Sequence, residues 1–260
     1  MIANVQAPLV LATSTARQVG RDGGQAARHL PVRIQLLMGF QLTAGGRPVS
    51  LPSSAERLLA LLSLNERPLR RNSAAGILWC NATEERANGN LRTTIWRSRK
   101  PGVEVVESNG TTLQLAAGVT VDVREMSSQA ERLLGTGRCS EGDYDDANLK
   151  GDLLPFWDDD WVVIDRERLR QLRLHALEKL CLRLTAEGRS GQAIAAGLAA
   201  VQAEPLRESA HRAVIAAHLS EGNHSEALGQ YRFFRKLLHS ELGLEPSGQL
   251  ESMMGSLTGR

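Results

Sequence analysis

The residues with the clearest chemical capability lie between Arg86 and Lys100, in the segment RANGNLRTTIWRSRK. This segment contains several arginines and a lysine but no acidic residue, and short hydrogen-bonding side chains lie between the basic ones. An arginine guanidinium binds guanine or phosphate through two parallel hydrogen bonds, while Asn and Thr reach base edges. The chemistry that these residue types favour is binding to double-stranded DNA.

The spacing of the segment predicts how these side chains are presented. Ala87, Leu91 and Ile95 recur every four residues, so one face of a helix over residues 82–100 is buried and the basic face is left free. The alternative is an ordinary solvated, arginine-rich helix, which the hairpin that follows makes less favourable. We expect these residues of the helix to contact DNA: Arg86, Asn90, Arg92, Thr93, Thr94, Arg97, Arg99 and Lys100.

The neighbouring elements would hold this helix in place. Residues 32–51 form short runs broken by glycine and proline, which predicts a small antiparallel sheet. Residues 53–65 predict a helix capped by Ser53 with Glu56, and residues 72–80 a shorter helix. Residues 103–107 and 111–115 predict two strands around an Asn109-Gly110 turn. A sheet, three helices and a hairpin describe a winged helix-turn-helix. The small polar residues at the tip of its wing, Asn109, Thr111 and Thr112, are expected to contact phosphate or the minor groove of DNA, the alternative being a plain surface turn. Trp96 is expected to pack on the wing.

The C-terminal half contains a repeated phrase of Glu-Gly, four residues and Ala. It occurs as EGDYDDAN at 141–148, EGRSGQAI at 187–194 and EGNHSEAL at 221–228. The last two copies are 34 residues apart, which matches the period of about 34 residues of a tetratricopeptide unit. The glycine would end the first helix of each pair and the alanine would let the second helix lie close to it. Residues 122–260 are therefore expected to form an array of stacked helices, beginning with an amphipathic helix from about 161 to 184.

Composition limits the remaining functions. The chain has 260 residues, 42% of them hydrophobic, and a formal net charge of only +2, so two domains are expected and DNA binding must rely on a local basic surface. Three dispersed cysteines fit reduced thiols in the cytoplasm. Residues 1–31 are interpreted as a loose tail with one short apolar patch, and no later stretch is apolar enough to span a bilayer. No catalytic, phosphate-loop or dinucleotide motif is present, so neither an enzyme nor a cofactor is expected.

Two further groups of residues allow a metal-binding interpretation. In FWDDDW (156–161), three aspartates lie between aromatic residues, but acidic residues before a long helix are accounted for by its dipole. The flanking Trp157 and Trp161 are expected to pack between helices. His211 and His218 are seven residues apart, without an obvious third ligand. We expect no metal site at either group.

The quoted segments together resemble a known family. LW at 78–79, RANGNLRTTIWRSRK, VEVVESNGTTLQL and VDV at 121–123 are similar to the OmpR-type DNA-binding domain of the Streptomyces antibiotic regulatory protein (SARP) family. Residues 151–180, PLRESAHR at 205–212 and QYRFFRKLLHSELGLEPS at 230–247 resemble the bacterial transcriptional activation domain of that family. The resemblance covers about residues 32–258 and divides the chain into a 1–31 tail, a 32–121 DNA-binding domain and a 122–260 activation domain.

The resemblance implies a function as well as a fold. Members of this family bind direct repeats in promoters, typically of secondary-metabolite genes, and help RNA polymerase holoenzyme to engage there. Direct repeats imply that two copies pair head to tail on the DNA. The chain departs from the family pattern at Ser98, where a buried Leu is usual, at Pro101, which ends the third helix early, and at Arg70, which leaves Asn72 or Ser73 to cap the second helix.

Two classes of function remain open at this point. The first is a sequence-specific transcriptional activator, and the second is a protein-interaction adaptor that binds nucleic acid weakly or not at all. Salt-dependent, sequence-selective DNA binding distinguishes the two classes.

Overall fold

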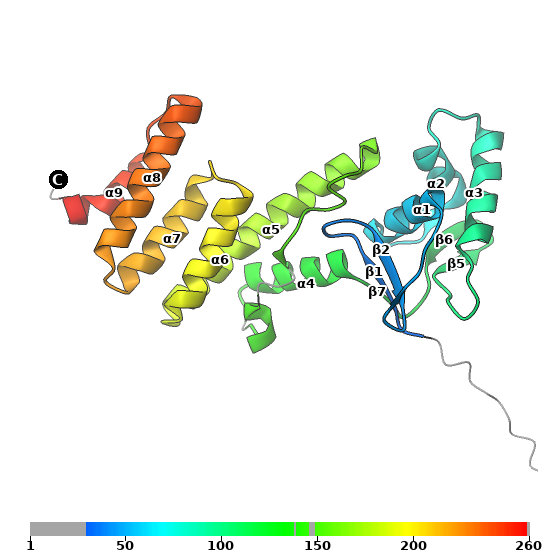
Figure 1. The fold of residues 1–260 in the computed structure, drawn as a ribbon, viewed down its shortest axis with the longest axis horizontal. Coiled ribbons are helices and arrows are strands. Elements are labelled where there is room, and N and C mark those ends of the chain that lie inside the picture. The colour runs from blue at the N-terminus through cyan, green and yellow to red at the C-terminus, as the bar shows by residue number, and fades with distance from the viewer. Residues whose placement is uncertain (1–29, 138, 146–148, 259–260) are drawn as a thin grey trace, which may run out of the picture.

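The computed structural model describes residues 30–137, 139–145 and 149–258, and its elements divide between a mixed N-terminal part and a helical C-terminal part (Figure 1). Most of the expected 1–31 tail lies outside these residues. Pro31 accepts a hydrogen bond from the Gly45 amide at 2.9 Å, so the described chain begins in contact with the first sheet.

Two small sheets frame the N-terminal part. The first has the order β3-β2-β1-β7, and its strands are β1 (Val32–Gln35), β2 (Gln41–Ala44), β3 (Arg47–Pro48) and β7 (Val119–Val121). The second has the order β4-β6-β5, with strands β4 (Leu69–Arg70), β5 (Val106–Asn109) and β6 (Thr112–Leu115). The expected hairpin is confirmed, since β5 and β6 pair antiparallel with Asn109 opposite Thr112. Strand β7, which lies parallel to β1, was not predicted.

Three helices lie between β3 and β5 in the sequence: α1 (Ser53–Leu64), α2 (Arg71–Leu78) and α3 (Glu84–Ser98). The expected caps of the first two are wrong. Helix α1 begins after Pro52, with Ser53 already helical, and no side chain caps it. Helix α2 likewise follows Arg70 without a side-chain cap, and Asn72 instead donates to Glu84 at 3.3 Å. Both helices are therefore held by their buried faces rather than by capping.

Helix α4 (Asp122–Leu134) joins the two parts without a linker, because it begins where β7 ends. The Asp122 carboxylate accepts hydrogen bonds from the amides of Leu36 and Leu37, at 2.9 to 3.0 Å, just beyond the end of β1. Burial raises the pKa of this carboxyl group, although the same amides counteract the shift. Asp122 thus fixes the start of α4 to the first sheet.

The C-terminal part is an all-helical array. After the short 3-10 helix η1 (Glu141–Tyr144), helices α5 to α9 follow one another across the molecule (Figure 1), with bounds α5 (Asp160–Ala186), α6 (Ser190–Ala203), α7 (Glu208–Ser220), α8 (His224–Leu242) and α9 (Gly248–Thr258). Each helix from α5 to α8 packs against the next one in the sequence, which confirms the tetratricopeptide-like architecture.

The repeated phrase is confirmed in two of its three copies. Gly188 and Gly222 end helices in the left-handed region, at φ 73° and 78°, and Ala193 and Ala227 are fully buried. The first copy is wrong. Gly142 lies within η1 and does not adopt a positive φ, and residues 146–148 lie outside the described residues. Only the later two phrases are corners of helical hairpins.

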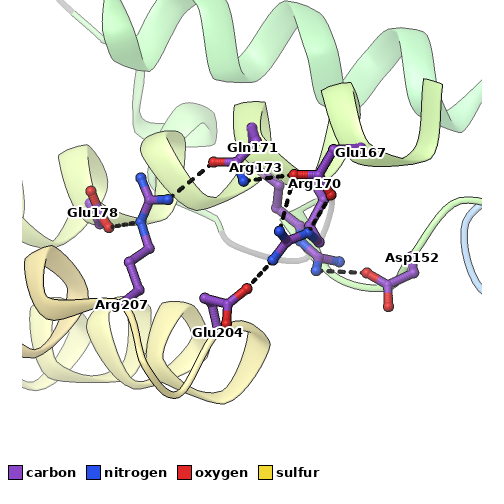
Figure 2. A network of polar contacts seen from close by, with 8 residues as sticks. All are labelled: Asp152, Glu167, Arg170, Gln171, Arg173, Glu178, Glu204 and Arg207. Atoms are coloured by element: carbon purple, nitrogen blue, oxygen red, sulfur yellow. Dashed lines mark hydrogen bonds and ion pairs between the residues drawn. The ribbon is translucent and has the colours of Figure 1, made fainter. Parts of the chain in front are cut away.

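Charged side chains tie α5 to the turn between α6 and α7 (Figure 2). Arg170 of α5 binds both Glu167 and Glu204, and Arg207 contacts Glu178 at 2.5 Å and Gln171 at 3.1 Å. The Arg170 guanidinium, followed by the Gln171 amide, lowers the pKa of Glu167 to about 2, so this carboxylate stays charged under ordinary conditions.

One hydrophobic core runs from the N-terminal sheets into α7. It includes Ile34 of β1, Leu59 of α1, Leu133 of α4 and Leu177 of α5, all essentially inaccessible to solvent. A second, smaller cluster lies at the far end, around Phe234 of α8. Within the described part of the chain, no helix is both long and apolar enough to cross a membrane.

Candidate nucleic-acid interface

Helix α3 lies along the outer side of the N-terminal part, at the end of the molecule away from α9 (Figure 1). The Thr83 hydroxyl accepts a hydrogen bond from the Arg86 amide at its N-terminus. Ala87, Leu91 and Ile95 are buried as predicted and fix the rotation of the helix about its axis. Ser98, at the position where the family usually has Leu, is also buried and donates to the Ile95 carbonyl at 2.8 Å. The C-terminal turn therefore stays packed despite the polar residue.

The rotation of α3 leaves two adjacent rows of side chains facing solvent. Helical spacing of three to four residues aligns Arg86, Asn90, Thr93 and Arg97 in one row. The second row contains Arg92, Trp96 and Arg99. All seven are exposed except Asn90, which is half-buried. The surface is basic, with small polar groups between the guanidinium groups, and Lys100 lies half-buried just beyond it.

The structure corrects the expectation that Thr94 contacts DNA. Its side chain is buried with only 3% of the residue exposed, because it lies on the same side of α3 as Leu91 and Ile95. Without rearrangement of the core it does not reach a base edge. Its neighbour Thr93 is exposed, although its hydroxyl donates to the Gly89 carbonyl at 3.1 Å.

Trp96 does not pack on the wing as expected. It is 72% exposed and lines an open groove of about 500 Å³ together with Pro52, Arg97, Arg99 and Lys100. An exposed indole among three cations offers a partner both an apolar ring face and neighbouring positive charge. Trp96 thus belongs to the same surface as the basic rows.

The hairpin supplies the second part of the candidate interface. Asn109 and Thr111 are exposed at its tip and Thr112 is half-buried. Strand β4 pairs with β6 and brings two arginines to the wing: Arg70 lies opposite Thr112, and Arg71 donates to the Ser108 hydroxyl at 3.0 Å. Glu107, the acidic residue of β5, is engaged within the hairpin, where first the Gln114 side chain and then the Ala117 amide lower its pKa.

Sequence reasoning therefore missed Arg70, Arg71 and Trp96. The two arginines are distant in sequence from the hairpin, and only the pairing of β4 with β6 shows their position. Trp96 could have been found, since it lies three residues after Thr93 and four after Arg92, on the side of α3 opposite the buried stripe.

The two groups considered as metal ligands have other contacts. Asp159 binds Arg57 at 2.5 Å and accepts from the Trp161 indole at 3.2 Å, and it does not cap α5. His211 contacts Pro205 and Gln230 in the helical array. The Nδ1 atom of His218 is buried without a hydrogen-bond partner and shares neither of these contacts. Among the described residues, no three His, Cys, Asp or Glu side chains are grouped as ligands for a metal.

Comparison with known proteins agrees with this architecture. Residues 146–257 match the family described as the bacterial transcriptional activator domain. Regulatory protein AfsR of Streptomyces coelicolor is 29% identical over 216 residues, covering 78% of this chain and 21% of AfsR. AfsR of Streptomyces griseus is 27% identical over 231 residues, covering 83% of this chain and 23% of its own length. The chain thus spans less than a quarter of these curated relatives.

Among solved structures, Mycobacterium tuberculosis EmbR in complex with a low affinity phosphopeptide has a similar fold. Its TM-score is 0.63 at 22% sequence identity, and the match covers 89% of this chain and 66% of the EmbR chain. At this identity the likeness concerns the fold, namely a winged helix followed by a tetratricopeptide-like array. The domain match, the two regulators and the shared fold together support the resemblance of the chain to the Streptomyces antibiotic regulatory protein family of transcriptional regulators.

Proposed function

We propose that the protein is a sequence-specific DNA-binding activator of transcription, in which residues 32–121 bind promoter DNA and residues 122–260 contact the transcription machinery. The observation that carries the proposal is the basic face that α3 presents from Arg86 onward, with Arg92 and Arg97 exposed on the helix and Arg99 exposed just beyond its end. A helix of this kind enters the major groove while the wing touches the adjacent backbone.

The proposed roles follow from the placement of each side chain. Arg86, Asn90, Arg92, Thr93 and Arg97 face the groove and contact bases or the phosphates that flank them. Arg99 and Lys100 reach the phosphate backbone. Trp96 covers sugar or thymine methyl groups between these cations, and Arg70 and Arg71 join Asn109, Thr111 and Thr112 against the backbone beside the wing. We propose a tail over residues 1–31, a DNA-binding domain over residues 32–121 and an activation domain over residues 122–260.

We further propose direct repeats as the target, because the regulatory family that the chain resembles implies them. Two copies would then bind head to tail, with RNA polymerase holoenzyme as the protein partner of the helical array. Promoters of secondary-metabolite genes are the proposed targets, and the cytoplasm is where such a bacterial protein would meet them. The alternative, an adaptor with vestigial nucleic-acid binding, remains the competing function.

Fluorescence anisotropy across a salt series tests the proposal. The probes are intergenic DNA from the neighbourhood of the gene and the same DNA scrambled. Selective binding that weakens with salt is expected, and Arg97→Ala is expected to lower affinity by about 1–3 kcal/mol. Arg235→Ala is a matched control, because Arg235 is an exposed arginine on α8, outside the proposed interface, and pairs with Glu245 just after that helix. Equal, feeble binding to both probes, unaffected by Arg97→Ala, would instead favour the adaptor.

A further inference from the structure

The segment between η1 and α5 makes contacts to both halves of the molecule. We call residues 151–159 the interdomain strap. On the helical side, the Arg166 guanidinium of α5 donates to the carbonyls of Leu153, Leu154 and Trp157 at 2.6 to 2.8 Å. Arg173, about two turns further along α5, binds Gly151 and Asp152, as Figure 2 shows for Asp152. The strap is thereby fixed to α5.

On its other side the strap pairs with the end of the first sheet. The Met38 amide donates to the Asp152 carbonyl at 2.9 Å, and the Leu154 amide donates to the Leu36 carbonyl at 3.0 Å. Leu37 and Leu153 form an antiparallel bridge between these two bonds. The helical part therefore continues the hydrogen bonding of the DNA-binding part, so the two cannot rotate against each other without breaking backbone bonds.

Side chains add a second set of contacts. The rings of Phe40 and Trp157 stack with centroids 6.2 Å apart and planes 22° apart. Arg57 of α1 donates two hydrogen bonds to Asp159, at 2.9 and 2.5 Å, and this ion pair is largely shielded, with side chains 30% and 20% exposed. The FWDDDW motif thus has interdomain contacts, which neither DNA binding nor a metal site requires.

Backbone conformation at this seam is unusual. Among the described non-glycine residues, positive φ occurs only at Met38 (φ 68°) and Leu154 (φ 42°), and both participate in the strap contacts. Gly151 has φ 84°, and a Cβ atom there would lie 2.6 Å from the Met38 Cγ. Residues other than glycine keep such conformations only where the surroundings force them to, and these cluster at sites where geometry matters for function.

We propose that the interdomain strap sets the orientation of the helical array relative to the bound DNA, and that Arg57 and Asp159 are positioning residues for transcription activation. This inference rests on the proposed function. A rigidly held array presents its polymerase-contacting surface at one place beside the promoter. A loosened array samples many orientations, which lowers the effective concentration of that surface at the polymerase. Breaking the ion pair should therefore weaken activation while leaving DNA affinity intact.

The test uses the full chain in three charge variants: Arg57→Asp, Asp159→Arg and the double exchange. Both single variants are expected to bind the promoter with unchanged Kd and to lose activation in reconstituted transcription by roughly tenfold. The double exchange restores the pair and should recover most of the activation. The control is the same exchange at Arg235 and Glu245, an ion pair with both side chains 55% exposed at the C-terminal end of α8, far from the strap.

A spectroscopic distance measurement reports the orientation of the two parts of the molecule independently of DNA binding and activation. Spin labels on the exposed Cys80 and on Glu221→Cys, with Cys139→Ser, lie in different halves of the molecule. A narrow distance distribution is expected in the parent protein, a broad one in each single variant, and a narrow one again in the double exchange. Trp157→Ala, which removes the stacking contact instead, should broaden it as well.

The outcomes separate the two proposals. Single variants that keep a narrow distribution, or that activate like the parent despite a broad one, would overturn the role of the strap. A parent protein that binds no promoter selectively would overturn the proposed function, while the distance measurement would still decide whether the strap fixes orientation.

Discussion

Trp96 shows how much a single side chain contributes to the character of the interface. At 72% exposure it is a large apolar group among Arg97, Arg99 and Lys100, on the face of α3 that is left free by the core. Burying an exposed apolar side chain of this kind against a partner lowers the free energy of binding, because its surface leaves water. In the proposed interface, the tryptophan would add an apolar contact to a surface that is otherwise electrostatic.

We expect Trp96→Ala to weaken promoter binding by about 1 kcal/mol, roughly fivefold in Kd, because part of an indole is no longer buried against DNA. The thermal midpoint should stay the same, since the side chain makes little contact within the folded protein. Anisotropy titrations and thermal denaturation measure the two effects. Trp96→Phe should retain most of the affinity. A Trp96→Ala variant that keeps the parental affinity, under conditions where Arg97→Ala weakens binding as expected, would remove Trp96 from the interface.

Gly197 is a residue whose small size is required by packing. A Cβ atom at this position of α6 would lie 2.6 Å from Val214 Cγ2 on α7 and 3.0 Å from the Cys181 sulfur on α5. Three helices therefore approach one another at this point as closely as a glycine allows.

Gly197→Ala is expected to lower the free energy of unfolding by about 1–3 kcal/mol through overpacking. Gly191→Ala, in the first turn of the same helix, meets no atom within 4 Å and should be neutral or stabilising by up to about 1 kcal/mol. Urea denaturation followed by circular dichroism measures both. Equal effects at the two glycines would show that the helix spacing is not limited by Gly197.

At the scale of elements, α7 and α8 are joined through a buried histidine. His211 is fully buried, its Nε2 lies 2.9 Å from the Pro205 carbonyl, and its Nδ1 lies 2.9 Å from the Gln230 amide nitrogen. Its ring also lies 4.3 Å from that of Phe234. A neutral ring that donates from Nε2 and accepts at Nδ1 satisfies both polar contacts, and burial lowers the pKa of this histidine.

This pKa direction gives a pH prediction. The unfolded state takes up a proton near pH 6.5, whereas the folded state does so only at lower pH. The contribution of His211 to stability is therefore complete above about pH 6.5 and decreases as the pH falls below it. Urea unfolding at several pH values should show a steeper loss in the parent than in His211→Asn. Parallel pH profiles would mean that the histidine protonates equally in both states.

For the whole molecule, the shared core predicts how the chain unfolds. The core that begins in the N-terminal sheets extends without a break to Ala217 of α7, while Phe234, Leu238, Leu250 and Met254 belong to a separate cluster at the C-terminal end. Asp122 and Arg124 of α4 add polar contacts between the parts, since the Arg124 guanidinium donates to the carbonyls of Leu62, Ser63 and Asn65 at the end of α1.

We expect residues 32–217 to unfold in a single transition and the amides of α8 and α9 to exchange earlier, because the small cluster opens at lower free energy. Native-state hydrogen exchange measures this order directly. A separate melting transition for residues 32–121 would contradict the continuous core and would also make the interdomain strap ineffective.

The sequence by itself determined those features that depend on local spacing. The buried stripe of α3, the Asn109-Gly110 turn and the helix ends at Gly188 and Gly222 follow from periodicity and from the φ values that only certain residues accept readily. The division into a winged helix and a helical array was predictable for the same reason, with the family resemblance in support. Local capping was less predictable, as Ser53, Asn72 and Ser73 show, because buried faces replaced caps.

Only the tertiary structure decided which distant residues meet. The sequence placed Thr94 among the groups that contact DNA, and the rotation of α3 buries it. Strand pairing brings Arg70 and Arg71 to the wing, and β7 with Asp122 closes the first sheet onto α4. The FWDDDW segment gained its partners from α1 and from the end of the first sheet. These contacts join residues about 40 to 120 positions apart, where no local periodicity carries information and only the packing of a continuous core selects the partner.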